Sequence, residues 1–257
     1  MPSPVLPGAE PYSAAGSRAG VLVLHGFTGS PQSMRGLAEA FAAAGSTVEL
    51  PVLPGHGTTP EDLATTGWED WLRAAEAALA DLQQRCDRVV VAGLSVGGAL
   101  ALQLARSHSD LAGIVVINPG IGPVPDEMAA QLRGALDAGV EFMPALGGDI
   151  ADPDAREVAY DRVSIAAALS LTAVNEVREG LADITCPVLL ITTDVDNVVD
   201  AASKDLVGTD VSGPVEVLRL HRSHHVATVD YDRAELEERA VAFVSRVLAA
   251  QDEVAAG

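Results

Sequence analysis

The stretch VVVAGLSVGGALAL, residues 89–102, decides the fold of this chain. A valine-rich run that is typical of a buried strand leads into Gly93, and helix-forming residues follow Gly97. Between the two glycines lies one serine, Ser95, in the pattern Gly-x-Ser-x-Gly. A sharp turn from strand to helix needs small flanking residues, because larger side chains would collide, and the turn lifts the serine hydroxyl above the sheet. We therefore predict that Ser95 is a nucleophile between a strand and a helix.

The same alternation of apolar strand and helical stretch continues on both sides of Ser95. It predicts an α/β fold with a mostly parallel central sheet and helices on both faces. The predicted strands are residues 21–27, 46–53, 88–95, 111–120, 186–194 and 214–220, and the predicted helices are residues 30–45, 60–86, 96–108 and 230–250.

Several residues predict where helices begin and end. Ser30 and Pro31 suit the start of the first helix, and Gly45 suits the position after its end. Asp232 and Glu235 have the spacing of a capping box, which predicts that the Asp232 side chain caps the last helix.

The alternation stops between residues 121 and 182, where no clear buried strand is found. Apolar residues at helical spacing predict an inserted helical cap, so residues 1–120 and 183–257 form the core and residues 121–182 the cap. We expect apolar residues of the cap to line a cavity, although more than half of the candidates will only pack the cap onto the core. The candidate lining residues are Ile121, Val124, Met128, Leu132, Phe142, Met143 and Leu146.

Composition excludes several classes of protein. The chain has 257 residues, 48% of them hydrophobic, which is enough for one large domain, and no apolar run is long enough to span a bilayer. A formal net charge of -20 repels nucleic acid and anionic lipid surfaces. No secretory signal is expected, because the N-terminus lacks a basic start followed by an apolar run. Cys86 and Cys186 are expected to be buried thiols in the reducing cytoplasm, with a single bridge as the alternative.

A nucleophilic serine needs a histidine base and an orienting carboxylate. In a fold with this turn, the acid follows a late strand and the histidine follows the last strand. Spacing alone does not choose within either group. The acid candidates are Asp194, Asp196 and Asp200, and the histidine candidates are His221, His224 and His225.

Two backbone N–H groups are candidate donors to an oxyanion. The N–H of Val96 lies at a helix N-terminus, where donors are unpaired and the dipole favours negative charge. The second donor is expected from the loop after an earlier strand, and the N–H of Phe27 in LHGFTGS suits it. His25 is expected to hold this loop by hydrogen bonds, and His56 is expected to be structural.

Motifs along most of the chain, from about Val21 to Asp232, carry a family resemblance. They include LHGFTGSPQSMRGLAEA, LPGHGTTPEDLATTGWEDW, GLSVGGALAL, DPDAREVAYDR, CPVLLITTDVDNVVD and SHHVATVDYD. In these motifs the chain resembles bacterial monoacylglycerol lipases and related small carboxylesterases of the α/β-hydrolase fold.

The resemblance implies which candidates act. The acid is Asp196, in an Asp-x-Val-Val step, and the histidine is His225. The oxyanion donors are Phe27 and Val96, and Glu157 matches a glutamate that contacts the glycerol group. Two positions depart from the family pattern: Asp200 stands where proline is frequent, and His224 where glycine or tyrosine is common.

The implied reaction is hydrolysis of monoacylglycerols through an acyl-enzyme, with no metal or organic cofactor. The substrate is a small lipid ester, so at most brief contact of the cap with a membrane or micelle is expected. A general carboxylesterase acting on short-chain esters is the main alternative. A ligand-binding protein without catalysis, a thioesterase and a carbon–carbon hydrolase are weaker alternatives.

Overall fold

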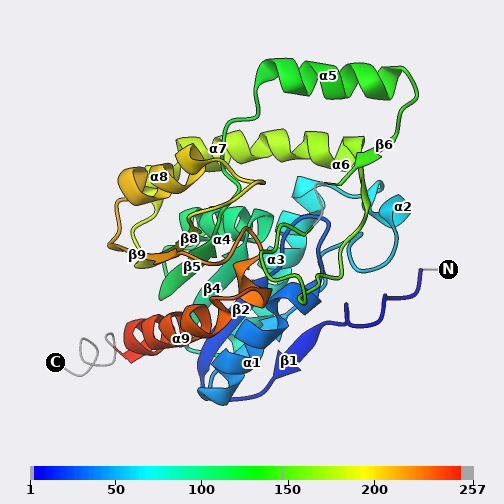
Figure 1. The fold of residues 1–257 in the computed structure, drawn as a ribbon. Helices are drawn as coiled ribbons and strands as arrows, with labels where there is room; N and C mark the ends of the chain where they lie inside the picture. Colours follow the sequence, from blue (N-terminus) through cyan, green and yellow to red (C-terminus); the bar gives the residue numbers. More distant parts are fainter. Residues whose placement is uncertain (1–2, 146–147, 250–257) are drawn as a thin grey trace.

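The protein is described by a computed structural model that covers residues 3–145 and 148–249 (Figure 1). Its centre is a seven-stranded sheet with the strand order β1-β3-β2-β4-β5-β8-β9. Neighbouring strands are parallel except β1, which is antiparallel to β3, so the predicted mostly parallel sheet is confirmed. The strands are β1 (Tyr12–Ala14), β2 (Ala19–Leu24), β3 (Thr47–Leu50), β4 (Arg88–Leu94), β5 (Gly113–Ile117), β8 (Val188–Thr193) and β9 (Val215–Leu220).

Helices cover both faces of this sheet, which explains why its central strands are continuous apolar runs. Because side chains alternate along a strand, Val91 packs into one core and Val90 into the other. The first core includes Trp71 of α3 (Trp68–Arg85) and much of α4 (Val96–Ser107). The second includes residues of α1 (Arg35–Ala43) and α9 (Arg233–Ala249).

Two predicted helices differ in detail from the observed ones. The first begins with a 3-10 turn, η1 (Pro31–Met34), after Ser30, and Gly45 follows α1 with a φ of 94°. The predicted helix 60–86 is wrong as a single element, because α2 (Pro60–Leu63) and α3 are separate. The Asp70 carboxylate accepts a hydrogen bond from Gly67 N at 3.1 Å and thereby starts a second helix.

The predicted capping box of the last helix is also wrong. The Asp232 carboxylate accepts hydrogen bonds from Arg222 N at 2.8 Å and Ser223 N at 2.9 Å. A long-range partner thus replaces the local one, and Asp232 fastens the loop that leads to His225.

The inserted segment between β5 and β8 contains helices and one small sheet. Its elements are α5 (Asp126–Asp137), β6 (Phe142–Pro144), β7 (Arg162–Ser164), α6 (Ile165–Ser170), η2 (Leu171–Ala173), α7 (Val174–Glu179) and η3 (Leu181–Asp183). The helices agree with the predicted helical cap, and the antiparallel pair β6–β7 is an addition that the sequence did not indicate. Each strand has three residues, too few to show an alternating pattern in the sequence. Helix α5 is the outermost element of the segment (Figure 1).

Two further expectations concern the chain as a whole. Cys86 and Cys186 are free and buried, as predicted. Across residues 3–145 and 148–249, none of the helices has the length and apolar character required to cross a bilayer.

Candidate active site

Ser95 lies at the sharp turn between β4 and α4, as the sequence predicts. Its backbone has φ 54° and ψ −115°, a strained conformation for a residue with a side chain. A Cβ atom on Gly93 would lie 2.1 Å from Gly97 O, and one on Gly97 would lie 2.3 Å from Leu24 O. Both glycines are therefore required by close backbone approach.

Asp196 and His225 meet beyond the carboxyl ends of β8 and β9. His225 Nδ1 lies 3.0 Å from Asp196 Oδ2, and both side chains are buried. Because a carboxylate accepts hydrogen bonds, Nδ1 carries the proton and Nε2 is left with a free lone pair. The structure therefore brings together one acid and one histidine of the six candidates.

The remaining candidates have other partners. Asp194 pairs with Arg219 and with His221 at the exposed surface. Asp200 begins α8 (Ala201–Asp210) by accepting a hydrogen bond from Ser203 N at 2.9 Å. His224 Nδ1 lies 3.0 Å from Asp149 Oδ1. The two departures from the family pattern thus have local roles beside the Asp196–His225 pair.

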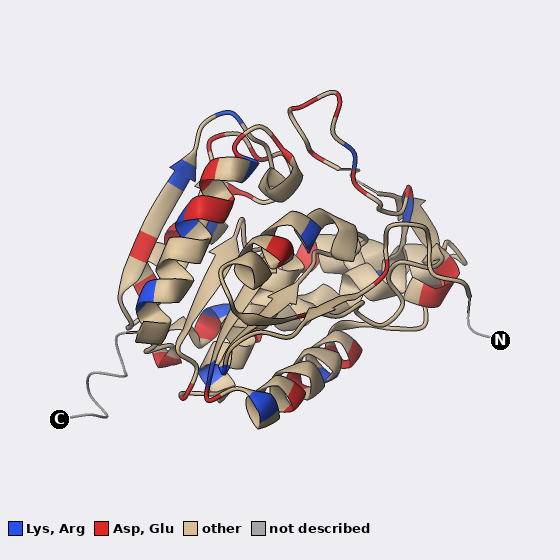
Figure 2. Cartoon of the chain, turned by 90° about the horizontal axis from the view of Figure 1, so that it is seen from below, with Lys and Arg blue, Asp and Glu red and all other residues tan. Residues whose placement is uncertain are grey.

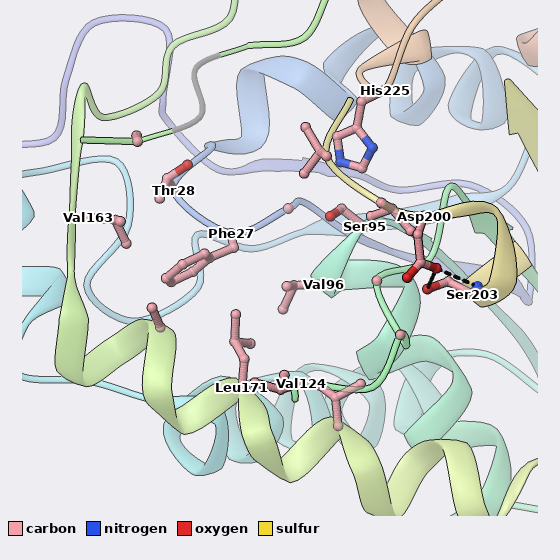
Figure 3. Close-up of a pocket in the computed structure, with 18 of the residues that line it drawn as sticks. Phe27, Thr28, Ser95, Val96, Val124, Val163, Leu171, Asp200, Ser203 and His225 are labelled. Carbon is pink, nitrogen blue, oxygen red and sulfur yellow. Dashed lines mark hydrogen bonds between the residues drawn. The ribbon is translucent and has the colours of Figure 1, made fainter. Parts of the chain in front are cut away.

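Ser95 and His225 line the same cavity, and their side chains lie close together in Figure 3. Within the described residues, no hydrogen bond of 3.5 Å or less joins Ser95 Oγ to His225. Such bonds are often long in enzymes without substrate and shorten when substrate binds.

The Asp196 carboxylate is surrounded by donors. Its Oδ1 accepts hydrogen bonds from Val198 N at 3.0 Å and Val199 N at 2.8 Å, and Lys204 Nζ lies 3.2 Å from Oδ2. Burial raises the pKa of Asp196, but the hydrogen bond and charge of His225 and the two backbone donors outweigh burial and lower the pKa to about 2. The acid is therefore ionised at neutral pH.

Phe27 and Val96, the predicted oxyanion donors, lie beside Ser95. Both line the same cavity as Ser95 (Figure 3). Neither backbone N–H has a hydrogen-bond acceptor among the described residues. The next residue, Thr28, has a φ of 63°, which marks a strained loop.

The loop that carries Phe27 is held by His25. His25 Nδ1 bonds Gly26 O at 2.9 Å, and its Nε2 accepts a hydrogen bond from Leu53 N at 3.0 Å. Complete burial lowers the pKa of His25 to about 4, so the ring is neutral and can make both bonds. His56 packs beside it with a pKa lowered by burial to about 3, in agreement with the structural role expected of it.

The cavity has a volume of about 550 Å³ and is largely apolar. Four predicted lining residues, Val124, Met128, Leu132 and Met143, do line it. The prediction is wrong for Ile121 and Phe142, and the seventh predicted residue is not among the described ones. Ile121 is fully buried in the core, Phe142 packs against the Arg162 guanidinium on the other side of β6, and Leu146 lies outside the described residues.

Glu157 is the acidic group of the inserted segment that lines this cavity. Its Oε1 atom approaches Gly29 so closely that a Cβ there would lie 2.7 Å from it. Burial raises the pKa of Glu157, against the opposing charge of His225. The structure thus places Glu157 in one cavity with Ser95 and His225. Together with Asp196, these two residues form the candidate triad.

Asp149 holds the loops of the acid and the histidine, and the sequence analysis missed it. Its carboxylate accepts hydrogen bonds from Asn197 N and Asn197 Nδ2, both at 2.8 Å, as well as contacting His224. These hydrogen bonds outweigh burial and lower its pKa. A lone aspartate in a glycine-rich stretch has no pattern that predicts this position.

Asn118 is a second missed residue, directly after β5. Its Nδ2 donates to His225 O at 2.9 Å, and its Oδ1 accepts from Thr193 N at 3.1 Å. It is fully buried with a φ of 40°. A polar residue at the carboxyl end of a buried strand was the available signal.

Comparisons with known proteins agree with this geometry. The model of the alpha/beta hydrolase family matches residues 21–239. A thermostable monoacylglycerol lipase of Bacillus sp. (strain H-257) is 42% identical over 95% of this chain and 97% of its own length. A carboxylesterase of Bacillus subtilis (strain 168) is 24% identical over 93% of this chain and 97% of its own length.

Solved structures give the same result. One structure of the metagenome-derived lipolytic enzymes LipS and LipT has a TM-score of 0.90 and 41% identity, and the match covers 95% of this chain and 100% of that chain. The monoacylglycerol lipase of Paleococcus ferrophilus shares the fold, with a TM-score of 0.77 and 18% identity over 93% of this chain and 99% of that chain. The chain belongs to the alpha/beta hydrolase family.

Proposed function

We propose that this chain is a serine ester hydrolase that cleaves monoacylglycerols to fatty acid and glycerol through an acyl-enzyme. The observation that carries the proposal is that Ser95 lines one apolar cavity together with His225, which is paired with Asp196. The relative named as a monoacylglycerol lipase, 42% identical over 95% of the chain, supports the substrate class.

The proposed reaction follows from the groups at the site. His225 Nε2 takes the proton of Ser95, and Ser95 Oγ attacks the ester carbonyl. The N–H groups of Phe27 and Val96 stabilise the oxyanion. Asp196 keeps His225 in the required tautomer and stabilises its charged form. The protonated histidine then gives its proton to the leaving glycerol, and water releases the fatty acid by the same steps.

Two parts of the cavity wall suit the two parts of the substrate, the acyl chain and the glycerol group. The apolar residues Val124, Met128 and Leu132 suit an acyl chain, and a volume of about 550 Å³ lies in the range of small-molecule pockets. Glu157 is proposed to contact the glycerol group, since its carboxyl lies in the same cavity near His225.

Residues 121–182 are proposed to act as a cap over the 1–120 and 183–257 core. Met128 is 52% exposed on the outermost helix, which suits brief contact with a micelle or membrane. Two buried free cysteines are compatible with a reducing cytoplasm, the proposed location.

Two measurements test the proposal. A fluorophosphonate probe should label the wild-type protein and fail to label Ser95→Ala, which should also lose hydrolysis of a short ester by at least about 1000-fold. Labelling of Ser95→Ala at the wild-type rate would contradict the assigned nucleophile, and an inert wild type would favour a ligand-binding protein.

Substrate class is decided by hydrolysis rates across monoacylglycerols of graded chain length, simple short-chain esters, and di- and triacylglycerols. We expect kcat/KM to be highest for monoacylglycerols. Higher values for short simple esters would instead identify a general carboxylesterase, the alternative supported by the carboxylesterase relative.

A further inference from the structure

Lys204 is the sole lysine of the chain, and it lies at the acid of the candidate triad. It belongs to the first turn of α8. Its Nζ is 3.2 Å from Asp196 Oδ2 and donates to Thr193 O at 3.1 Å. The side chains of Lys204 and Asp196 are only 12% and 2% exposed, so water screens this ion pair little.

Lys204 and His225 share one oxygen of the acid. Asp196 Oδ2 lies 3.0 Å from His225 Nδ1 and 3.2 Å from Lys204 Nζ. The other oxygen, Oδ1, is already occupied by two backbone N–H groups. The single negative charge of Asp196 therefore faces one permanent cation and one group that becomes cationic during the proposed reaction.

We propose that Lys204 is a positioning residue whose charge, acting through Asp196, sets the lowest pH at which His225 can serve as the base. This inference rests on the proposed function. A cation beside the carboxylate cancels part of the negative potential that favours the imidazolium. We therefore expect activity to extend to lower pH with Lys204 present than it would with an isolated Asp196–His225 pair.

The other charged groups around the pair do not supply this effect. Those that the structure places around the pair are Asp149 and Glu157 from the inserted segment, His224 from the same loop and Asp200 from the start of α8. Three are acids, and His224 is itself paired with Asp149. Among the described groups bonded to Asp196 or His225, Lys204 is the one permanent cation.

Three variants separate charge from hydrogen bonding. Lys204→Arg keeps the charge, Lys204→Gln keeps a donor for Thr193 O without the charge, and Lys204→Met removes both. The measurement is kcat/KM against pH with a water-soluble short ester, with the melting temperature of each variant as the check on folding.

The acidic limb of the profile should move up by about one pH unit in Lys204→Gln and Lys204→Met, and stay near the wild-type position in Lys204→Arg. At pH values on the acidic side of the profile, this shift corresponds to a roughly tenfold lower kcat/KM than that of the wild type. A purely structural lysine would lower the plateau or the melting temperature and leave the limb in place. If the Gln and Met limbs superimpose on that of the wild type, the inference is wrong, and the Gln–Arg pair decides it if Lys204→Met does not fold.

Ser95→Ala, measured on the same ester, separates the two proposals. If Ser95→Ala hydrolyses the ester at the wild-type rate, the proposed function itself is wrong. An inactive Ser95→Ala combined with unmoved limbs in the Lys204 variants would remove only the role of Lys204.

Discussion

At the scale of single residues, the site depends on a backbone conformation that its neighbours enforce. Ser95 has a positive φ, which costs about 1–3 kcal/mol for a residue with a side chain. Its N–H donates to Ile117 O at 2.9 Å, and the close approaches at Gly93 and Gly97 leave the chain no room to relax. The strain is thus held by packing of β4, β5 and α4 around the serine.

Gly97→Ala should test this enforcement. The new Cβ would meet the Leu24 carbonyl oxygen at 2.3 Å, and a backbone atom of the paired strand β2 cannot move aside without disturbing the sheet. We expect a loss of about 1–3 kcal/mol in the free energy of unfolding. A shift of about 1 Å in the sharp turn that carries Ser95, the nucleophile elbow, should lower kcat/KM about 100-fold.

Gly134→Ala is the matched control, because nothing lies within 4 Å of its Cβ position in exposed helix α5. It should increase the free energy of unfolding by about 0.5–1 kcal/mol, measured by urea denaturation. Equal effects of the two substitutions would refute the steric account of the elbow.

Glu157 gives a prediction about pH and stability. Its raised pKa means that the folded protein holds this proton more tightly than the unfolded chain. Wild-type stability therefore falls as pH rises above the ordinary glutamate value of 4.5. Glu157→Gln has no such proton, so its melting temperature should exceed that of the wild type at about pH 7 and match it at about pH 4.

If the melting-temperature difference between wild type and Glu157→Gln is the same at both pH values, burial does not raise the pKa of Glu157. Hydrolysis supplies a second check. Glu157→Ala should raise KM for a monoacylglycerol and leave KM for a simple ethyl ester unchanged, because only the first substrate has a glycerol group.

At the scale of elements, the pieces of the candidate triad come from three strand ends and are joined by side chains that do not react. Asn118 links the end of β5 to His225 O and to Thr193 N of β8. Asp149 links the inserted segment to the loops after β8 and β9. Helix α8 brings Lys204 to Asp196 after Asp200 caps its first turn.

Asp149→Ala should loosen two loops at once. The N–H groups of Asn197 and the ring of His224 lose their acceptor, which should cost about 1–3 kcal/mol of unfolding free energy. The pKa of Asp149 is lowered, so this contribution is present above the ordinary value of 3.8 and is lost as pH falls below it. The stability difference between wild type and variant should therefore shrink in acid.

Asp154→Ala serves as the control, because Asp154 is an exposed aspartate of the same segment. It should be neutral in both stability and rate. The Asp149 substitution should in addition lower kcat for a short ester about 100-fold, since displaced loops separate the reacting groups. Full activity in Asp149→Ala would show that the loops hold their positions without it.

At the scale of the whole molecule, the charge of -20 affects how a lipid substrate is met. Charged residues belong mainly to the outer helices and loops, whereas the central strands contain few (Figure 2). Such a surface repels anionic interfaces at long range, and salt screens the repulsion over about 10 Å at 0.1 M.

Monoacylglycerol in anionic mixed micelles should therefore be hydrolysed more slowly than in neutral mixed micelles at low salt, and the difference should vanish at about 1 M salt. The rates are compared at equal substrate content, with a water-soluble neutral ester as the control for direct effects of salt on the site. A preference for anionic micelles at low salt would contradict this picture and point to a local basic surface.

The sheet and the turn at Ser95 are determined by short stretches of the sequence. Apolar runs bounded by glycine predicted six strands of the parallel sheet, because a strand buried on both faces must be apolar throughout. The glycines around Ser95 predicted the elbow, since no other residue fits backbone contacts this close. The pattern failed for β1, β6 and β7, each only three residues long.

Tertiary structure decided what local pattern could not. Spacing after β8 and β9 left three acids and three histidines open, and the family resemblance pointed to Asp196 and His225. The fold adds that these two side chains meet, whereas Asp194 pairs with another histidine at the surface. Asp149 reaches the loops of Asp196 and His225 from the inserted segment. Lys204 reaches Asp196 from the next helix, and no sequence pattern predicted either contact. A hydrogen bond or ion pair between distant residues depends on where whole elements pack, whereas a turn or a buried strand depends on its own few residues.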